Sequence, residues 1–253
     1  MDNKTILSNE NFYDRLANEY DQMISFRNAV ENKRRILANF IVPGMKYAAD
    51  LGCGSGADSI ALASAGLKVA AFDPSDEMLK VAKENVEKKI VKVSFHNYRI
   101  DEIPDEFNDQ FDIVVSLGNT FANIPKEKLY ESLKRCFQIL KPDGILFIQV
   151  LNYEKILNER ERVVNITEGK DKYYVRFYDF TTTEIIFNIL TFSKINLSDY
   201  MLITTLVFPH LQNDLIQEIK KAGFFSIELY SDFNQSAFDK QSSKDLVIRS
   251  QKV

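Results

Sequence analysis

The chain has 253 residues, 45% of them hydrophobic, which is enough to bury a large core in one enzyme-sized unit. Its formal net charge is -4 and its basic residues are scattered among acids, which argues against nucleic acid as a partner. No apolar run approaches the roughly 20 residues of a membrane span, and the polar amino terminus lacks the pattern of a signal peptide. We therefore expect a cytoplasmic protein that needs no membrane. Cys53 and Cys136 have no metal-ligand spacing, so we expect no metal site.

The first two thirds of the chain alternate between helical and strand-like patterns. Apolar residues at helical spacing over residues 10–41 predict two amino-terminal helices that end before Pro43. Short apolar runs then predict strands at 47–51, 68–72, 91–95, 111–116 and 145–151. Helical patterns separate them at 57–65, 75–88 and 126–139, and a turn at 141–144 precedes the fifth strand. This alternation is typical of a parallel sheet.

The period changes to two between residues 163 and 208. Runs rich in β-branched and aromatic residues at 173–180, 184–195 and 201–208 predict an antiparallel β insertion. A helix at 212–222 and strands at 226–231 and 245–249 complete the pattern. We predict an α/β fold: a doubly wound, Rossmann-like, mostly parallel sheet of seven strands with an antiparallel β insertion and N-terminal helical cover. The predicted division is 1–44 for the covering helices, 45–162 with 209–253 for the main domain, and 163–208 for the insertion. The insertion is expected to cover the substrate or to contact a second copy.

The strongest local motif is a glycine-rich loop between the first strand and the first helix of the sheet. Its residues, which we expect to bind a cofactor, are Asp50, Gly52, Cys53, Gly54 and Gly56, with Leu51 and Ser55 between them. Glycine lets the backbone approach a ligand closely. A dinucleotide fingerprint has G-x-G-x-x-G spacing, whereas this loop has G-x-G-x-G with an acid before it. A carboxylate beside a pyrophosphate would be repulsive, so a cofactor with a cationic end, such as S-adenosylmethionine, suits the loop better than NAD.

A second acid, Asp73, ends the second predicted strand, 17 residues beyond Gly56. At that place a carboxylate can accept hydrogen bonds from both ribose hydroxyls of an adenosine-containing ligand. The alternative is structural: the glycines build a turn, and Asp73 caps the helix that begins near Ser75.

Residues 48–151 resemble the class I S-adenosylmethionine-dependent methyltransferases. The resemblance rests on the D-x-G-x-G-x-G loop, the acid after the second strand, and the Leu-Lys-Pro-Asp-Gly segment at 140–144. Within that family, the segments at 57–60, 75–80, 117–122, 152–157 and 208–210 are similar to glycine N-methyltransferases and glycine/sarcosine methyltransferases.

The resemblance implies S-adenosyl-L-methionine as the cofactor and assigns residues to it. The implied cofactor contacts beyond the loop and Asp73 are Pro74, Met78, Asn97, Tyr98, Leu117 and Arg27. Asn97 and Tyr98 match an adenine-contacting pair, and Arg27 matches an arginine that binds the cofactor carboxylate. One departure concerns the substrate: Leu151 stands where the glycine-specific enzymes have an arginine that clamps the substrate carboxylate. Glycine and sarcosine are therefore expected to be poor substrates.

Three residues are candidates for catalysis. Asn119, just beyond the fourth strand, is expected to orient the acceptor, and its structural alternative is a turn asparagine after Gly118. Tyr20 matches a tyrosine near the transferred methyl group, and His210 is a candidate general base. We predict a methyltransferase acting on an amine nitrogen of a small molecule; the alternatives are an O-methyltransferase and a regulatory module that only binds the cofactor. A homo-oligomer is compatible with this prediction.

Overall fold

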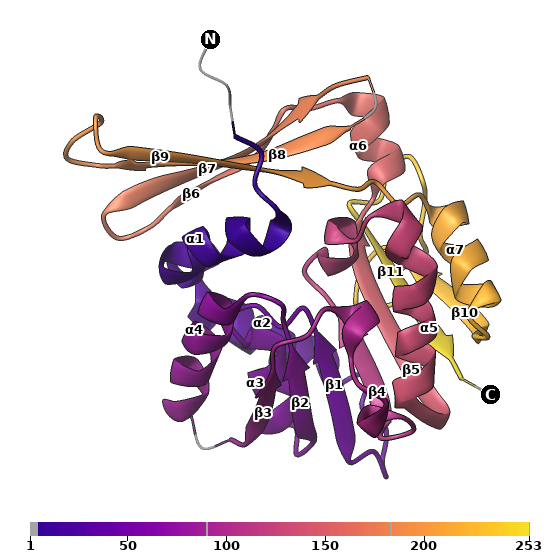
Figure 1. The fold of residues 1–253 in the computed structure, drawn as a ribbon. Coiled ribbons are helices and arrows are strands. Elements are labelled where there is room, and N and C mark those ends of the chain that lie inside the picture. Colours follow the sequence, from indigo (N-terminus) through magenta and orange to yellow (C-terminus); the bar gives the residue numbers. More distant parts are fainter. Residues whose placement is uncertain (1–4, 90, 183, 253) are drawn as a thin grey trace.

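The computed structural model describes residues 5–89, 91–182 and 184–252. A seven-stranded sheet, here called the main sheet, forms the centre of the molecule (Figure 1). Its strands are β1 (Tyr47–Leu51), β2 (Lys68–Phe72), β3 (Val93–His96), β4 (Phe111–Ser116), β5 (Leu140–Leu151), β10 (Phe225–Tyr230) and β11 (Asp245–Gln251), in the order β10-β11-β5-β4-β1-β2-β3. The first five strands are parallel, and β11 is antiparallel to both of its neighbours.

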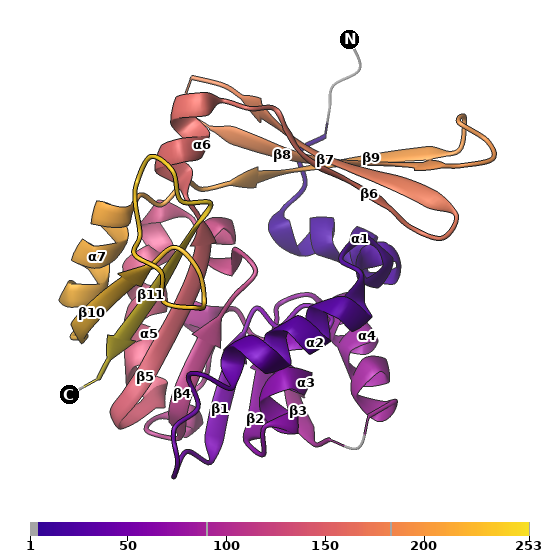
Figure 2. The same ribbon diagram turned by 180° about the vertical axis from the view of Figure 1, so that it is seen from behind.

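Helices cover both faces of the main sheet. On one face lie α2 (Phe26–Leu37), α3 (Ala57–Ser64) and α4 (Asp76–Glu87), of which α2 and α3 are nearest the viewer in Figure 2. On the other face lie α5 (Leu129–Ile139) and α7 (Gln212–Lys221). Alternate residues of each central strand face opposite sides, so that Val114 packs in the core beneath α5 and Val115 in the core beneath α2 and α3. Both faces are thereby buried, as a doubly wound parallel sheet requires.

The insertion forms a separate four-stranded antiparallel sheet, here called the insertion sheet. Its strands are β6 (Val163–Glu168), β7 (Lys172–Phe180), β8 (Ile185–Ser193) and β9 (Tyr200–Val207). Helix α1 (Asn9–Met23) lies between the insertion sheet and the main sheet (Figures 1 and 2). Phe12 and Leu16 of α1 pack against Ile189 and Ile203 of the insertion sheet. The helix therefore attaches the insertion sheet to the rest of the molecule through an apolar core.

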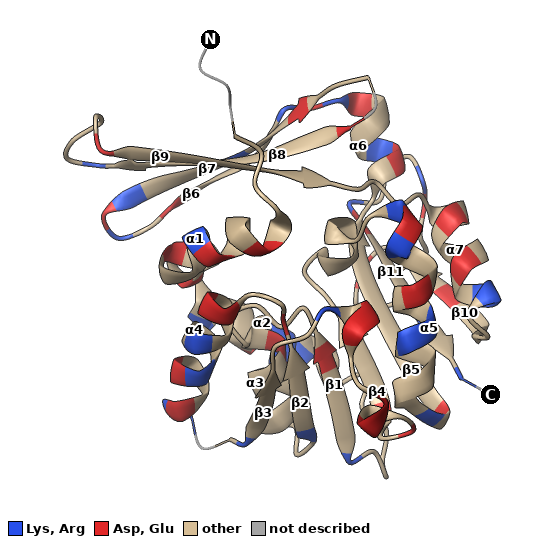
Figure 3. Cartoon of the chain, viewed as in Figure 1, with Lys and Arg blue, Asp and Glu red and all other residues tan. Residues whose placement is uncertain are grey.

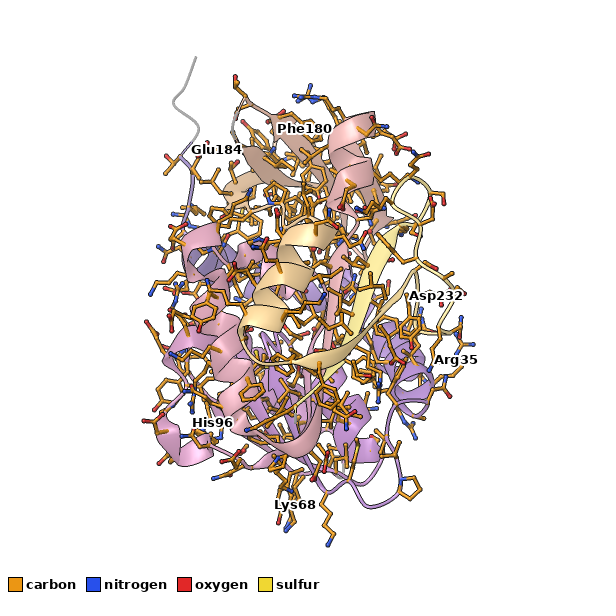
Figure 4. All side chains as sticks on the ribbon, turned by 90° about the vertical axis from the view of Figure 1, so that its right-hand side faces the viewer. Arg35, Lys68, His96, Phe180, Glu184 and Asp232 are labelled. Carbon is orange, nitrogen blue, oxygen red and sulfur yellow. The ribbon has the colours of Figure 1, made fainter. Side chains whose placement is uncertain are left out.

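Polar contacts attach α1 to the main domain as well. The Ser75 hydroxyl, at the start of α4, donates a hydrogen bond of 2.5 Å to the Asp14 carboxylate of α1. Ten residues further along the chain, Asn85 of α4 donates to Asp21 of α1 at 2.7 Å. Figure 4 shows how far apart the two ends of the molecule lie: Lys68, at the amino end of β2, is at the foot, and Phe180 and Glu184 of the insertion are at the top.

The predicted fold is confirmed, with three local differences. First, 140–144 is not a turn before the strand, because β5 begins at Leu140 and Gly144 pairs with Lys252 at the carboxyl terminus. Second, β6 and the short helix α6 (Tyr153–Glu159) were not predicted as separate elements. Third, the helix predicted from residue 126 starts as a 3-10 turn, η4 (Lys126–Lys128). Further 3-10 turns are η1 (Ile100–Glu102), η2 (Asp105–Phe107) and η3 (Thr120–Asn123). None of the described helices is long and apolar enough to cross a membrane.

Candidate active site

A cavity of about 580 Å³ lies where the carboxyl ends of the parallel strands meet α1 and the insertion sheet. This is the edge at which open α/β sheets bind ligands. Three parts of the chain line it: the loops after β1 to β4, the amino-terminal helices, and the insertion. The lining residues used below are Tyr13, Tyr20, Lys33, Gly52, Cys53, Gly54, Ser55, Asp73, Pro74, Met78, Tyr98, Leu117, Gly118, Thr120, Asn123 and Arg176.

The glycine-rich loop has a backbone that only glycine adopts readily. Gly52, Gly54 and Gly56 have φ of 73°, 51° and 89°, in the left-handed region. A Cβ atom at Gly52 would lie 2.3 Å from Cγ2 of Thr120, so a side chain does not fit there. The loop therefore presents its backbone to the cavity, and Thr120 is packed directly against it.

Asp73 organises this loop from the end of β2. Its two carboxylate oxygens accept hydrogen bonds from the backbone N–H groups of Gly54, at 2.8 Å, and Ser75, at 2.9 Å. Burial raises the pKa of Asp73 to about 6, although these two hydrogen bonds lower it. Each carboxylate oxygen accepts more than one hydrogen bond, so Asp73 keeps acceptor capacity on the cavity side. The structural reading of Asp73 and the ribose-binding reading are therefore compatible.

Asp50 does not line the cavity. Its carboxylate is buried behind the loop and accepts a hydrogen bond of 2.5 Å from the hydroxyl of Ser59 on α3. Burial and the neighbouring carboxylate of Asp58 raise the pKa of Asp50 to about 8. The expected direct contact between this carboxylate and a cationic cofactor group thus has no counterpart among the cavity-lining residues.

The adenine-contacting pair separates in the structure. Tyr98 lines the cavity and is 36% exposed. Asn97 lies outside the lining, and its side-chain amide donates to the carbonyl of Pro74 and to the carboxylate of Asp76, both at 2.9 Å. Asn97 therefore holds the loop between β2 and α4, and only Tyr98 is placed to touch a ligand directly.

Of the three catalytic candidates, only Tyr20 lines the cavity. The Asn119 amide donates to the Tyr153 hydroxyl at 3.0 Å, and its carbonyl oxygen accepts from the backbone of Leu151 at 3.0 Å. Asn119 has φ of 71°, as its alternative role of turn asparagine requires. His210 is buried with Nε2 at 2.8 Å from the carbonyl of Ile124. The structure does not bring Asn119 or His210 into the cavity.

The amino-terminal helices contribute a cation at a different position from the expected one. Arg27 is exposed on α2 and is not among the residues that line the cavity. Lys33, almost two turns further along α2, does line it and pairs with Asp58 at 2.9 Å. Leu151 also lies outside the lining and packs against the cluster that contains Tyr153 and Tyr178.

Several lining residues are not among the predicted site residues. Ser55 is 2% exposed, and its hydroxyl has no hydrogen-bond partner among the described residues. Tyr13, Thr120, Asn123 and Arg176 join it. Only Arg176 left a signal: it lies between Tyr174 and Tyr178 on one face of a strand that alternates with period two, where an arginine is unexpected.

The residues present fit S-adenosylmethionine. The buried, unpartnered Ser55 hydroxyl and the free acceptor capacity of Asp73 are polar groups that a ligand with amine and ribose groups would satisfy. Met78, Tyr98 and Leu117 supply apolar surface for a purine ring. Cys53 lines the cavity too, and burial raises the pKa of its thiol, which keeps it neutral. No group of three or more His, Cys, Asp or Glu side chains in the described part of the chain could hold a metal ion.

Comparison with known proteins agrees with this site. Residues 48–144 match a family model described as a methyltransferase domain. The chain is 29% identical over 197 residues to the glycine/sarcosine N-methyltransferase of Aphanothece halophytica. The aligned region covers 76% of this chain and 71% of that enzyme. It is 32% identical over 161 residues to the human glycine N-methyltransferase, covering 57% of this chain and 53% of that one. The match thus spans about half the length of the human enzyme.

Solved structures share the fold over almost the whole chain. An S-adenosylmethionine-dependent methyltransferase from Clostridium acetobutylicum superposes with a TM-score of 0.76 at 16% identity, covering 95% of this chain and 98% of that one. The amino pentose methyltransferase CalS10 from Micromonospora echinaspora, solved with S-adenosylmethionine bound, gives a TM-score of 0.62 at 11% identity over the full length of both chains. With the glycine-rich loop and Asp73, these matches show that residues 48–144 form a methyltransferase domain and that the chain as a whole has the fold of S-adenosylmethionine-dependent methyltransferases.

Proposed function

We propose that the enzyme transfers the methyl group of S-adenosylmethionine to the nitrogen of a small-molecule amine. The observation that carries this proposal is the cavity itself. It lies between the glycine-rich loop and the insertion sheet, and its volume of about 580 Å³ falls in the range of about 300–1,000 Å³ typical of small-molecule sites. The names of the glycine and glycine/sarcosine N-methyltransferases among its relatives support nitrogen as the acceptor atom.

In this proposal the main-domain half of the cavity holds the cofactor, which supplies the reactive methyl group. Asp73 accepts hydrogen bonds from the ribose hydroxyls, and the backbone of Gly52 and Gly54 gives the cofactor close access to the loop. Gly56 does not line the cavity; it is the left-handed residue from which α3 begins. The list of proposed contacts also includes Cys53, Ser55, Pro74, Met78, Tyr98 and Leu117, all of which line the cavity. Asp50 acts through its hydrogen bond to Ser59, which fixes α3 against the loop.

Catalysis then depends on alignment of the amine with the methyl group. Transfer is an in-line displacement, and holding both reactants at near-attack distance supplies much of the rate enhancement. The amine must lose its proton before it can attack. Burial raises the pKa of Tyr13 and of Tyr20 above their ordinary values, so both remain neutral hydroxyls that can accept a hydrogen bond from the amine. We assign to Tyr20 the position nearest the reacting methyl group, because its ring reaches the glycine-rich loop at Gly54.

The test is methyl transfer by the purified enzyme from labelled S-adenosylmethionine to separate pools of amines and of alcohols and phenols. We expect labelled N-methyl products from the amine pool. Asp73→Ala tests whether transfer depends on the proposed cofactor site, because this variant should lower the rate of methyl transfer without changing the product. If only labelled O-methyl products formed, the acceptor atom would be oxygen and not nitrogen. Tight cofactor binding without transfer to either pool would favour a regulatory module.

A small molecule also suits the surface of the enzyme. Figure 3 shows Lys and Arg interspersed with Asp and Glu on the outer helices, without the basic stripe that a nucleic-acid partner requires. We further propose that residues 163–208 and the helices within 1–44 serve as the cover of the site. A homo-oligomer and a cytoplasmic location stay predictions.

A further inference from the structure

The insertion sheet places one arginine over the cavity. Arg176 lies on β7 between Tyr174 and Tyr178, and these three residues share the sheet face that packs on α1. Directly opposite Arg176 on β8 is Ile189, which is 1% exposed and belongs to the apolar core with α1. Arg176 is thus a cation at the border of an apolar core, and its side chain lines the cavity.

Arg176 differs from the neighbouring cations in its lack of an acid. Arg162 pairs with Asp179, Lys172 with Glu19 and Lys194 with Glu168. In contrast, Arg176 forms no ion pair with any described residue. Burial lowers the pKa of Arg176, and the groups that act on it electrostatically are the hydroxyls of Tyr13, Tyr20 and Tyr178. Arg176 is half-buried, and a cation taken partly out of water without a counter-charge is destabilised, so that proteins normally supply it with an anion.

The guanidinium is held in a fixed orientation. Its Nε–H donates a hydrogen bond of 2.6 Å to the side-chain oxygen of Asn165 on the adjacent strand β6. That bond leaves the two terminal nitrogens for another partner. A guanidinium presented in this way matches the two oxygens of a carboxylate.

We propose that Arg176 binds a carboxylate of the methyl acceptor, so that the preferred substrates are amines that also carry a carboxylate. This inference rests on the proposed function. Because Leu151 packs outside the cavity, the anion is bound from the insertion sheet instead of from β5. Tyr20 links the two halves of the site: it lines the same cavity as Arg176, and its Cε1 atom lies 3.9 Å from where a Cβ of Gly54 would be. An acceptor held by Arg176 therefore has its amine near the glycine-rich loop.

The cofactor also has a carboxylate, and the structure offers it a different cation. Lys33 lines the cavity beside Asp58, at the start of α3 just after the glycine-rich loop, whereas Arg176 lies across the cavity on the insertion sheet. The experiment must separate these two carboxylates. It compares the acceptor's and the cofactor's affinity in the same variant.

The decisive variant is Arg176→Met, with Arg162→Met as its matched control, because Arg162 is an arginine next to the same sheet but outside the cavity. Binding of demethylated cofactor is measured by calorimetry. Methyl transfer is measured with matched pairs, each an amino acid and its amide: glycine, sarcosine, β-alanine and phenylalanine with their amides. We expect the wild type to prefer at least one acid over its amide by more than about 10-fold in kcat/KM. In Arg176→Met the efficiency for that acid should fall about 100-fold, and the preference should vanish.

The control outcomes are equally specific. Arg162→Met should keep the preference, and both variants should bind demethylated cofactor within about 3-fold of the wild type. A 10-fold loss of cofactor affinity in Arg176→Met would show that Arg176 binds the cofactor carboxylate, and would overturn the inference. The inference would also be overturned if the wild type methylated the amides as efficiently as the acids, or methylated only amines without a carboxylate. The proposed function would stand in either case. Absence of transfer to every amine would overturn both this inference and the proposed function.

Since Arg176→Met removes an uncompensated charge, we expect the variant to fold. Arg176→Gln is the second variant if it does not.

Discussion

The two halves of the cavity differ in how their charges are compensated. On the main-domain side, the Asp73 carboxylate is already held by backbone N–H groups of Gly54 and Ser75. On the insertion side, Arg176 has one hydrogen bond and no acid among the described residues. In the proposed assignment, the half that binds the cofactor is organised before any ligand arrives, whereas the insertion half carries a charge that the acceptor would neutralise.

The largest expected effect tests how rigid the cofactor half is. Gly52→Ala should lower the free energy of unfolding by about 2–5 kcal/mol, because a left-handed φ costs about 1–2 kcal/mol and overpacking against Thr120 costs about 1–3 kcal/mol more. Urea unfolding measures the loss. Gly66→Ala is the matched control, since Gly66 has φ of 95° but open space around it. Equal losses in the two variants would show that contact with Thr120 does not matter.

The next effect concerns cofactor binding by the same half. Asp73→Ala should weaken the binding of S-adenosylmethionine by about 1.5–3 kcal/mol, because the ribose hydroxyls lose charge-assisted hydrogen bonds. Calorimetry measures this. The control is Asp76→Ala, which removes a carboxylate that binds Asn97 outside the cavity. Unchanged affinity in a folded Asp73→Ala protein would remove Asp73 from the cofactor site.

A pH series probes the acids behind the loop. The folded-state pKa values of Asp50, about 8, and Asp73, about 6, are raised above the usual value of 3.8 for an aspartate. For a raised acid the folded chain keeps its proton after the unfolded chain has lost it. Its stabilising contribution is complete below about pH 4 and is lost as the pH rises through the folded-state value.

We therefore expect the free energy of unfolding of the ligand-free enzyme to fall by about 2–3 kcal/mol between pH 6 and pH 8, mainly through Asp50. Asp50→Asn should flatten this fall, because the amide does not titrate and its oxygen can still accept from Ser59. Urea unfolding at each pH provides the measurement. A wild-type stability that rises over this interval, or an unaltered slope in the variant, would contradict the assignment.

The attachment of the insertion sheet to α1 should depend little on charge. Lys172→Met breaks the ion pair with Glu19, whose side chains are 31% and 23% exposed, and should cost less than about 1 kcal/mol of unfolding free energy. The apolar core around Phe12 and Leu16 provides most of this attachment. Thermal unfolding compares the variant with Lys194→Met, which breaks a pair within the insertion alone. A much larger loss in Lys172→Met would make the ion pair the principal link.

The smallest expected effect is that of a chelator. Because alignment and hydrogen bonding suffice for methyl transfer in the proposed mechanism, EDTA should leave the rate unchanged. Steady-state rates with and without EDTA check this. A loss that one divalent metal restores would require a metal in one half of the cavity.

Periodicity predicted most of the fold, and its failures have local causes. The alternation of helices and strands from residue 47 onward required only that both faces of the sheet be buried. In contrast, the segment at 140–144 contains Pro142, Asp143 and Gly144, which favour a turn. It joins β5 because Lys252, more than 100 residues away, pairs with it. Such long-range pairing leaves no trace in a local pattern.

The candidate site divides in the same way. The sequence by itself determined the main-sheet strands, the glycine-rich loop and Asp73, because a left-handed backbone and a strand end restrict which residues occur there. Only the tertiary structure decided which side chains face the cavity. Asn119 and His210 are hydrogen-bonded to neighbouring residues, whereas the Ser55 hydroxyl has no partner among the described residues and Arg176 uses only its Nε–H, toward Asn165. The physical reason is that a polar side chain joins a site or supports it according to whether the folded chain supplies its hydrogen-bond partners, and those partners come from distant segments.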